Sequence, residues 1–314
     1  MLLPILSLLA GFILLMWSAD AFTDNGAKIA RIFNISPLVI GLLIFGFGTS
    51  APEMLVSGLA AYDGHPEMSI GNAFGSNILN IGLVLGVTAI ILPITVEKSV
   101  LKKEWLFLFL STLIVGFLLL DGFLSFTDGL ILISLLTLFL INVFRESKKN
   151  NLTDSDNDSL ENNSQKNDKG RTWLLLIVSL IILVSSARLV VWGGTSLALS
   201  FGVSDLIIGL TVVALGTSLP ELAVSISSAL KKQHQMVIGN IIGSNLFNTL
   251  GVLAIPGLIL PFQIPTEVMS RDYLFMLMFT LLVLILSMRL KISRFGGFIL
   301  LTALAIYLYQ LFWI

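Results

Sequence analysis

The sequence of 314 residues is 56% hydrophobic and only 12% charged, and its formal net charge is −1. Because an ordinary soluble domain has about 25% charged residues, this composition predicts a protein embedded in a lipid bilayer. The balanced charge gives no basic surface for nucleic acid. The absence of cysteine excludes disulfides and thiolate metal ligands. The expected partner is therefore the lipid bilayer, and the sequence indicates neither nucleic acid nor an obligatory protein partner.

Hydrophobic runs divide the chain into candidate membrane spans, each of which needs about 20 mostly apolar residues. The first half contains five such runs, near residues 3–22, 37–61, 68–94, 104–121 and 125–144. Residues 145–171 are rich in Asn, Asp, Ser and Lys and are predicted to form a flexible linker. Five more runs follow, near residues 172–192, 204–230, 235–260, 271–288 and 295–313. The predicted fold class is an all-α polytopic membrane protein with ten transmembrane helices.

The two halves of the chain are related by an internal duplication. Residues 41–87 align without a gap with residues 209–255, at a constant offset of 168 positions, and roughly twenty of the aligned pairs are identical. The chain thus divides into a first five-helix repeat, residues 1–144, and a second, residues 172–314. An odd number of spans per repeat gives the halves opposite orientations. The sequence therefore predicts inverted repeats related by a pseudo-two-fold axis in the membrane plane.

The distribution of Lys and Arg supports this topology. With ten spans, the loops on one side carry 16 of the 18 Lys and Arg residues, and the other side carries only Arg188 and Arg271. Positively charged loops face the cytoplasm. The 145–171 linker is therefore expected in the cytoplasm and both termini outside, in a multi-pass protein of the plasma or inner membrane.

Each repeat places one carboxylate inside an apolar run, directly after a Gly-Thr-Ser-x-Pro segment. Glu53 follows Pro52 in the first repeat, and Glu221 follows Pro220 in the second. Proline removes a backbone N–H and clashes with the preceding turn, so both helices are predicted to kink or break there. A broken helix frees carbonyl oxygens, which are tolerated at membrane depth only where they line a cavity or coordinate something.

The residues around the two prolines offer oxygen ligands, which suit Na⁺, Ca²⁺ or Mg²⁺. The candidates are the carboxylates of Glu53 and Glu221, the hydroxyls of Thr49, Ser50, Thr217 and Ser218, and the carbonyls of Gly46 and Ala214. A single intramembrane Glu could instead be a protonated core residue. Two at equivalent positions favour a cation site, because burying a carboxylate at the bilayer centre costs several kcal/mol and the chain does it twice.

The second duplicated motif is Gly-Asn-x-x-Gly-Ser-Asn, at residues 71–77 and 239–245. Its paired glycines lie one helical turn apart, which lets a neighbouring helix approach closely; they are Gly71, Gly75, Gly239 and Gly243. Two further pairs share one helix face and add oxygen ligands; they are Ser76 with Asn80, and Ser244 with Asn248. The remaining amides are open to either packing or ion binding; they are Asn72, Asn77, Asn240 and Asn245. Inverted symmetry predicts that the two motifs meet at the membrane midplane.

With these motifs the sequence resembles the calcium/cation antiporter superfamily, and within it the microbial sodium/calcium exchangers. The segments GFGTSAPE and ALGTSLPE match the two α-repeat signatures of that group, and the α-repeats here cover residues 37–94 and 204–260. The resemblance extends over essentially the whole chain. It implies ten spans in inverted five-helix repeats, a core of helices two, three, seven and eight, and two long tilted helices, one and six, that slide across the core.

The resemblance also implies a ligand set and a function. Glu53 and Glu221 would be the principal ligands shared by Ca²⁺ and Na⁺. The remaining ligands carried over by motif position are Ser50, Ser218, Thr49, Thr217, Ser76, Ser244 and Asn80, with the carbonyls of Gly46 and Ala214. The implied function is secondary active antiport of Na⁺ against Ca²⁺ by alternating access, with no cofactor and no enzymatic activity.

One position departs from the family pattern, because several exchangers carry Asp where this chain has Asn248. The site then has two carboxylates rather than three, which leaves the Na⁺ stoichiometry, the electrogenicity and the coupling ion open. A proton- or potassium-coupled calcium/cation antiporter of the same superfamily is the alternative. A channel is disfavoured because the sequence gives no pore-lining ring. An intramembrane enzyme is disfavoured because no metalloprotease or Ser-His motif lies in the spans.

Overall fold

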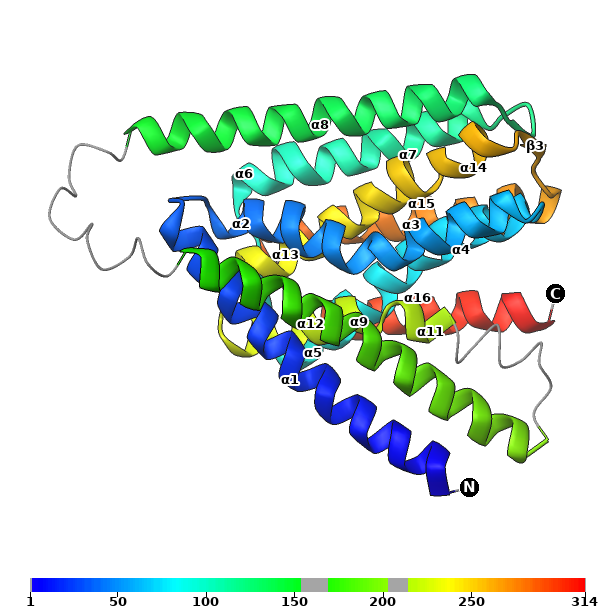
Figure 1. Ribbon diagram of the computed structural model, residues 1–314. Helices are drawn as coiled ribbons and strands as arrows, with labels where there is room; N and C mark the ends of the chain where they lie inside the picture. The colour runs from blue at the N-terminus through cyan, green and yellow to red at the C-terminus, as the bar shows by residue number, and fades with distance from the viewer. Residues whose placement is uncertain (1, 154–168, 203–213, 314) are drawn as a thin grey trace, which may run out of the picture.

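The computed structural model describes residues 2–153, 169–202 and 214–313, and these are almost entirely helical (Figure 1). The first repeat contains α1 (Leu2–Ile32), α2 (Pro37–Ile40), η1 (Gly41–Phe45), α3 (Gly46–Tyr62), α4 (Pro66–Leu79), η2 (Asn80–Leu85), α5 (Gly86–Ile91), β1 (Ile94–Thr95), α6 (Lys98–Val100), η3 (Leu101–Trp105), α7 (Leu106–Leu118), β2 (Phe123–Leu124) and α8 (Phe126–Thr153). The second contains α9 (Lys169–Ser200), α11 (Ala214–Thr217), α12 (Leu219–Leu230), α13 (His234–Leu246), η6 (Phe247–Val252), α14 (Ala254–Ile259), β3 (Phe262–Gln263), η7 (Val268–Tyr273), α15 (Leu274–Ser287), β4 (Lys291–Ile292) and α16 (Arg294–Trp313).

Eight helical stretches of the described chain are long and apolar enough to cross a membrane. They coincide with eight of the ten predicted runs, so the prediction of a helical polytopic membrane protein is confirmed. The predicted run 104–121 corresponds to α6, η3 and α7, whose start carries the charged residues Lys102, Lys103 and Glu104. The predicted run 204–230 is described only from Ala214 onward, as α11 and α12.

The helices α1 and α9 are longer than the apolar runs that predicted them. They contain 31 and 32 residues. At 1.5 Å per residue each is about 47 Å long, well beyond the ~30 Å hydrocarbon core of a bilayer. The extra turns of α1 carry Asp24, Lys28 and Arg31, and hydropathy therefore ended the predicted run too early. The two helices lie side by side and run obliquely to the others in Figure 1.

The helix irregularities repeat with the sequence. The π-helical segments η2 and η6 occupy equivalent positions in the two halves, and so do η3 and η7. The predicted break is found in the second repeat, where Ser218 separates α11 from α12. In the first repeat α3 continues through Pro52 without a break, so of the predicted kink or break only the kink stays a prediction there. Proline removes one hydrogen bond, and a helix packed on several sides can lose it without ending.

The ends of the predicted linker are helical. The helix α8 continues to Thr153 and α9 begins at Lys169, while residues 154–168 of the predicted linker lie outside the described residues. Extending an existing helix adds one hydrogen bond for each residue fixed, so a polar continuation needs no apolar face. In Figure 1 these two helix ends lie at the left, and the N-terminal end of α1 and the C-terminal end of α16 lie at the right.

Two short antiparallel strand pairs depart from a purely helical fold. The strand β1 pairs with β4, and β2 pairs with β3. The 168-residue offset relates one strand pair to the other, because it places β1 at the position of β3 and β2 at the position of β4. Strands of two residues have no periodicity to detect in the sequence. Each pair ties a connection in one repeat to a connection in the other.

Candidate cation site

The two intramembrane glutamates are the most enclosed charged groups of the described chain. Glu53 lies on α3 and Glu221 on α12, and each residue is only 1% exposed. Their four carboxylate oxygens have no hydrogen-bond partner among the described residues. The helices that carry them, α3 and α12, are in contact. Two buried carboxylates that repel each other are stable only with bound cations or protons.

Among the other buried polar side chains that lack a partner, four lie in or just after the two duplicated motifs. Ser50 and Ser218 have buried hydroxyls, and Asn80 and Asn248 have buried amides, that meet no hydrogen-bonding group among the described residues. Buried polar groups are paired in the great majority of cases. Together with the two glutamates these four form three symmetric pairs, so their oxygens are available to a ligand that the protein chain does not supply.

Helix packing brings the two motifs of opposite repeats together. The helix α3, which carries Glu53, packs against η6, which begins one residue before Asn248. The helix α12, which carries Glu221, packs against η2, which begins at Asn80. π-helical turns are rare and frequently occur at functional sites, since they displace side chains from regular helical positions. Both asparagines therefore enter the site from an irregular turn, a signal that the sequence motif does not contain.

Thr49 links the two repeats inside this cluster. Its hydroxyl donates to the Phe45 carbonyl at 2.9 Å, and its oxygen lies 3.2 Å from the Ser244 hydroxyl and 3.5 Å from Asn240 Oδ1. Two predicted ligands from different repeats, Thr49 and Ser244, are thus in direct contact.

The other predicted ligands lie on α3, α4 and α11. Ser76 is 3% exposed on α4, and its hydroxyl is 3.5 Å from Asn72 Oδ1. Thr217 ends α11 next to Ser218, and Ala214 begins the same helix. Gly46 begins α3, where the helix is continuous. Because Pro52 has no N–H, the carbonyl that loses its usual helical donor in this repeat is that of Gly48.

Asn72 and Asn240, whose role the sequence left open, each hydrogen-bond to the backbone of a glutamate. The Asn72 side-chain amide donates to the Glu53 carbonyl at 3.2 Å and to the Ser57 hydroxyl at 3.0 Å. In the second repeat Asn240 makes the equivalent bonds, to the Glu221 carbonyl at 3.3 Å and to the Ser225 hydroxyl at 3.0 Å. The bond to the carbonyl fixes the backbone of each glutamate against the neighbouring helix. By contrast, Asn77 bonds to Thr249 and Asn245 bonds within its own helix.

Replacing Asn72 or Asn240 by Ala is expected to weaken cation binding about tenfold without unfolding the protein. The substitution removes the donor that holds the glutamate backbone in place, and loss of such supporting hydrogen bonds typically costs 10- to 100-fold in metal affinity. Calorimetric titration of the purified variants with Ca²⁺ measures the effect. Asn245→Ala is the matched control, because among the described residues that amide bonds to Ile241 of its own helix. Equal affinity in Asn72→Ala and Asn245→Ala would contradict the positioning role.

Close helix contact on one side of the site follows from the glycines of α13. A Cβ atom on Gly243 would lie 2.4 Å from the Leu42 carbonyl oxygen, and one on Gly239 would lie 2.5 Å from the Leu38 carbonyl oxygen. Gly41 and Gly46 face the same crossing from the other helix. The predicted small-residue crossing is thus confirmed for Gly239 and Gly243. The equivalent crossing of Gly71 and Gly75 would involve residues 209–213, which lie outside the described residues.

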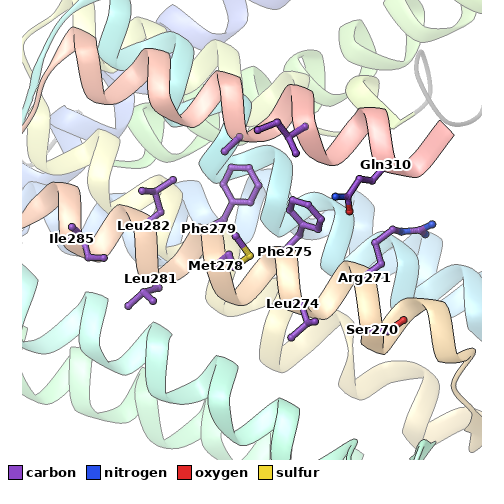
Figure 2. Close-up of a pocket in the computed structure, with 12 residues that line it drawn as sticks. Ser270, Arg271, Leu274, Phe275, Met278, Phe279, Leu281, Leu282, Ile285 and Gln310 are labelled. Atoms are coloured by element: carbon purple, nitrogen blue, oxygen red, sulfur yellow. The ribbon is translucent and has the colours of Figure 1, made fainter. Parts of the chain in front are cut away.

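A large cavity elsewhere in the described chain is apolar and unrelated to this site. It measures about 620 Å³ and lies between α15 and α16, where Phe275, Met278, Phe279 and Leu282 line it (Figure 2). Arg271 and Gln310 lie at one end of it (Figure 2). Arg271 is paired with Asp272 through two hydrogen bonds of 2.8 and 3.2 Å. The cavity contains neither glutamate, so the oxygen cluster is the better candidate for ion binding.

The fold is that of a helical polytopic membrane protein in which the two duplicated motifs pack together around buried carboxylates. The family described as "Sodium/calcium exchanger protein" matches residues 3–145 and again residues 171–313, one match for each repeat. The chain therefore belongs to the sodium/calcium exchanger family.

Individual relatives agree with this assignment. The chain is 36% identical to the inner membrane protein YrbG of Escherichia coli (strain K12), over 100% of this chain and 98% of the relative. It is 29% identical to the sodium/calcium exchanger MaX1 of Methanosarcina acetivorans, over 98% of both. A solved structure of the sodium-calcium exchanger NCX_Mj, soaked with zero Na⁺ and Ca²⁺, matches with a TM-score of 0.86 and 36% identity, over 99% of each chain.

Proposed function

We propose that this protein is a secondary active antiporter that exchanges Na⁺ for Ca²⁺ at the Glu53/Glu221 site. The observation that carries the proposal is the symmetric set of buried oxygens without partners, contributed equally by two inverted repeats. Inverted repeats with a midplane site at their interface are typical of alternating-access transporters. Membership of the sodium/calcium exchanger family supports the choice of ions.

The charge of the site explains exchange without leak. Two carboxylates balance one Ca²⁺ or two Na⁺, and no cluster of three or more His, Cys, Asp or Glu side chains among the described residues is arranged to add more negative charge. An empty carboxylate pair is costly to enclose in a medium of low dielectric constant. The protein therefore changes its access only when cations occupy the site. Ca²⁺ and Na⁺ compete for it, so Na⁺ moving down its concentration gradient drives Ca²⁺ in the opposite direction, against its own gradient.

The proposed topology has ten spans, with both termini outside and the 145–171 linker in the cytoplasm. Two features support it. The Lys and Arg residues divide 16 to 2 between the loops of the two sides. The helix ends that flank the linker and the helix ends at the termini lie on opposite sides of the molecule in Figure 1. Labelling of single cysteines at either end in intact cells tests this arrangement.

Uptake of radiolabelled Ca²⁺ into proteoliposomes is expected to follow an outward Na⁺ gradient. The matched arm replaces that gradient with an outward proton gradient at the same membrane potential. Uptake with Na⁺ alone establishes sodium/calcium exchange. Uptake with protons alone would overturn Na⁺ coupling, while the fold and both glutamates would keep their roles.

Asn248→Asp is expected to add a third Na⁺ to the cycle. Asn248 is fully buried, and its side-chain amide has no partner among the described residues. A third carboxylate needs a third monovalent cation for neutrality, so the Hill coefficient for Na⁺ should rise from about two toward about three. Transport by the variant should then depend on membrane potential, whereas exchange by the unmodified protein should not. Asn245→Asp is the matched control on the same stretch. Potential-dependent exchange by the unmodified protein would contradict this charge balance.

A further inference from the structure

An ion-pair cluster outside the cation site attaches α1 to α12. Lys231 follows the last residue of α12, and its Nζ lies 3.0 Å from Asp20 Oδ1 and 2.8 Å from Asp24 Oδ1. Lys231 also donates to the Asp20 backbone carbonyl at 2.9 Å. The Ser227 hydroxyl donates to Asp20 Oδ1 at 2.6 Å. Four polar contacts thus hold the middle of α1 to the end of α12.

The 168-residue offset places a second pair of opposite charges at the equivalent positions. Asp20 corresponds to Arg188 on α9, and Lys231 corresponds to Asp63, the residue that follows α3. The acidic and the basic residue change places between the repeats, but the two charges remain opposite. Asp63 and Arg188 are exposed, and neither makes an ion pair among the residues that the structure describes. Both repeats therefore carry oppositely charged residues for this contact, but among the described residues only the Lys231 ion pairs are formed.

Helix packing shows the same asymmetry. The helix α1 packs along α12, whereas its counterpart α9 makes only a small contact with α3. A separate apolar cluster joins α1 and α9 to α12 and includes Leu15, Phe22, Leu183 and Val224. The structure thus holds one of the two long helices against the opposite repeat and leaves the equivalent contact of the other unmade.

We propose that Arg188 and Asp63 form the matching ion pair in the alternative conformation, and that the two pairs alternate as the access of the cation site changes. This rests on the antiport function proposed above. In alternating access, inverted repeats related by a pseudo-two-fold axis exchange their conformations. The contact of α1 with α12 then passes to α9 and α3. Lys231, Asp20, Arg188 and Asp63 act as positioning residues that set the balance between the two conformations.

The two contacts are unequal, so the protein favours the conformation described here. Lys231 meets two carboxylates, and Ser227 adds a hydrogen bond. At the positions equivalent to Asp24 and Ser227 the other repeat has Trp192 and Leu59. The alternative pair therefore consists of one guanidinium and one carboxylate. Removing the stronger contact should shift the equilibrium further than removing the weaker one.

Engineered cysteine pairs test the proposal directly, because the chain contains no cysteine. In Asp63→Cys/Arg188→Cys, a short bifunctional thiol reagent is expected to join the two positions during turnover with Na⁺ and Ca²⁺, and to stop transport until the reagent is cleaved. Tyr62→Cys/Arg188→Cys is the matched control, in which the first cysteine is displaced by one residue. Absence of the Asp63–Arg188 crosslink in protein that exchanges Ca²⁺ would overturn the proposed pair. Absence of exchange in the unmodified protein would instead overturn the antiport function.

Charge substitutions supply the second readout. Lys231→Met in the Asp63→Cys/Arg188→Cys background is expected to raise the crosslinking rate about threefold to tenfold, because it frees α1 from α12. Lys232→Met is the matched control, since Lys232 makes no ion pair among the described residues. In proteins without cysteine, Asp63→Arg and Arg188→Asp should each slow exchange, and the double exchange of charges should restore it. An unchanged crosslinking rate in Lys231→Met, or no recovery in the double variant, would overturn the alternation.

Discussion

Glu53→Gln and Glu221→Gln are each expected to abolish Ca²⁺ transport while the protein stays folded. Both carboxylates are 1% exposed and have no hydrogen-bond partner among the described residues. Glutamine has nearly the same shape but no charge, so each variant halves the negative charge that balances a divalent cation. At about 1.4 kcal/mol for each tenfold change, a loss of several kcal/mol corresponds to a decrease in affinity of about 100-fold or more.

The stability of these variants separates a transport defect from misfolding. A buried charge without a partner destabilises a protein more than a buried amide does. The free energy of unfolding without Ca²⁺ should therefore stay equal or rise, while stabilisation by added Ca²⁺ should disappear. Thermal unfolding with and without Ca²⁺, together with uptake into proteoliposomes, measures both. Glu67→Gln is the control, because Glu67 is exposed in the first turn of α4. Normal Ca²⁺ flux in either buried variant would refute the role of the glutamates.

The candidate ligands could be proposed from the sequence because the same motif occurs twice. A carboxylate after a Gly-Thr-Ser-x-Pro segment is conspicuous in an apolar run, and its repetition after 168 residues favours a cation site over a protonated core residue. The structure buries Glu53 and Glu221 together with Ser50, Ser218 and the two asparagines that follow the second motif in each repeat. Their role as cation ligands remains a prediction, supported by the lack of partners for their polar atoms.

Contacts between distant residues could not be predicted in the same way. Asn72 reaches a backbone carbonyl 19 residues earlier, on a neighbouring helix, and Lys231 reaches Asp20 on α1, which lies 211 residues earlier in the chain. Neither contact leaves a periodic signal, because its geometry depends on how the helices cross. The π-helical turns at Asn80 and Asn248 could not be predicted from the sequence either, since the same residues are compatible with a regular α-helix. The length of α1 was underestimated because charged residues can continue a helix beyond the bilayer.

Gly243→Ala is expected to destabilise the protein by about 3 kcal/mol, the upper end of the roughly 1–3 kcal/mol that overpacking typically costs, because the contact is with backbone. The added Cβ would lie 2.4 Å from the Leu42 carbonyl oxygen and 2.9 Å from its Cα. Both are backbone atoms, so no side chain can rotate away and the two helices must separate. Thermal unfolding of the purified variant measures the effect, as a lower midpoint or as a failure to recover folded protein.

The same crossing holds Thr49 against Ser244, whose hydroxyl oxygens are 3.2 Å apart. Any Gly243→Ala protein that folds should therefore also bind Ca²⁺ more weakly, because ligands of opposite repeats no longer meet at the same distance. Gly58→Ala is the matched control on α3, where the added Cβ would make an ordinary contact of 3.6 Å with Ile255. That variant should be as stable as the unmodified protein or more stable by about 0.5–1 kcal/mol, since alanine favours a helix over glycine. Equal stability of the two variants would show that the backbones at this crossing can move apart freely, and the site would then owe its geometry to the side chains alone.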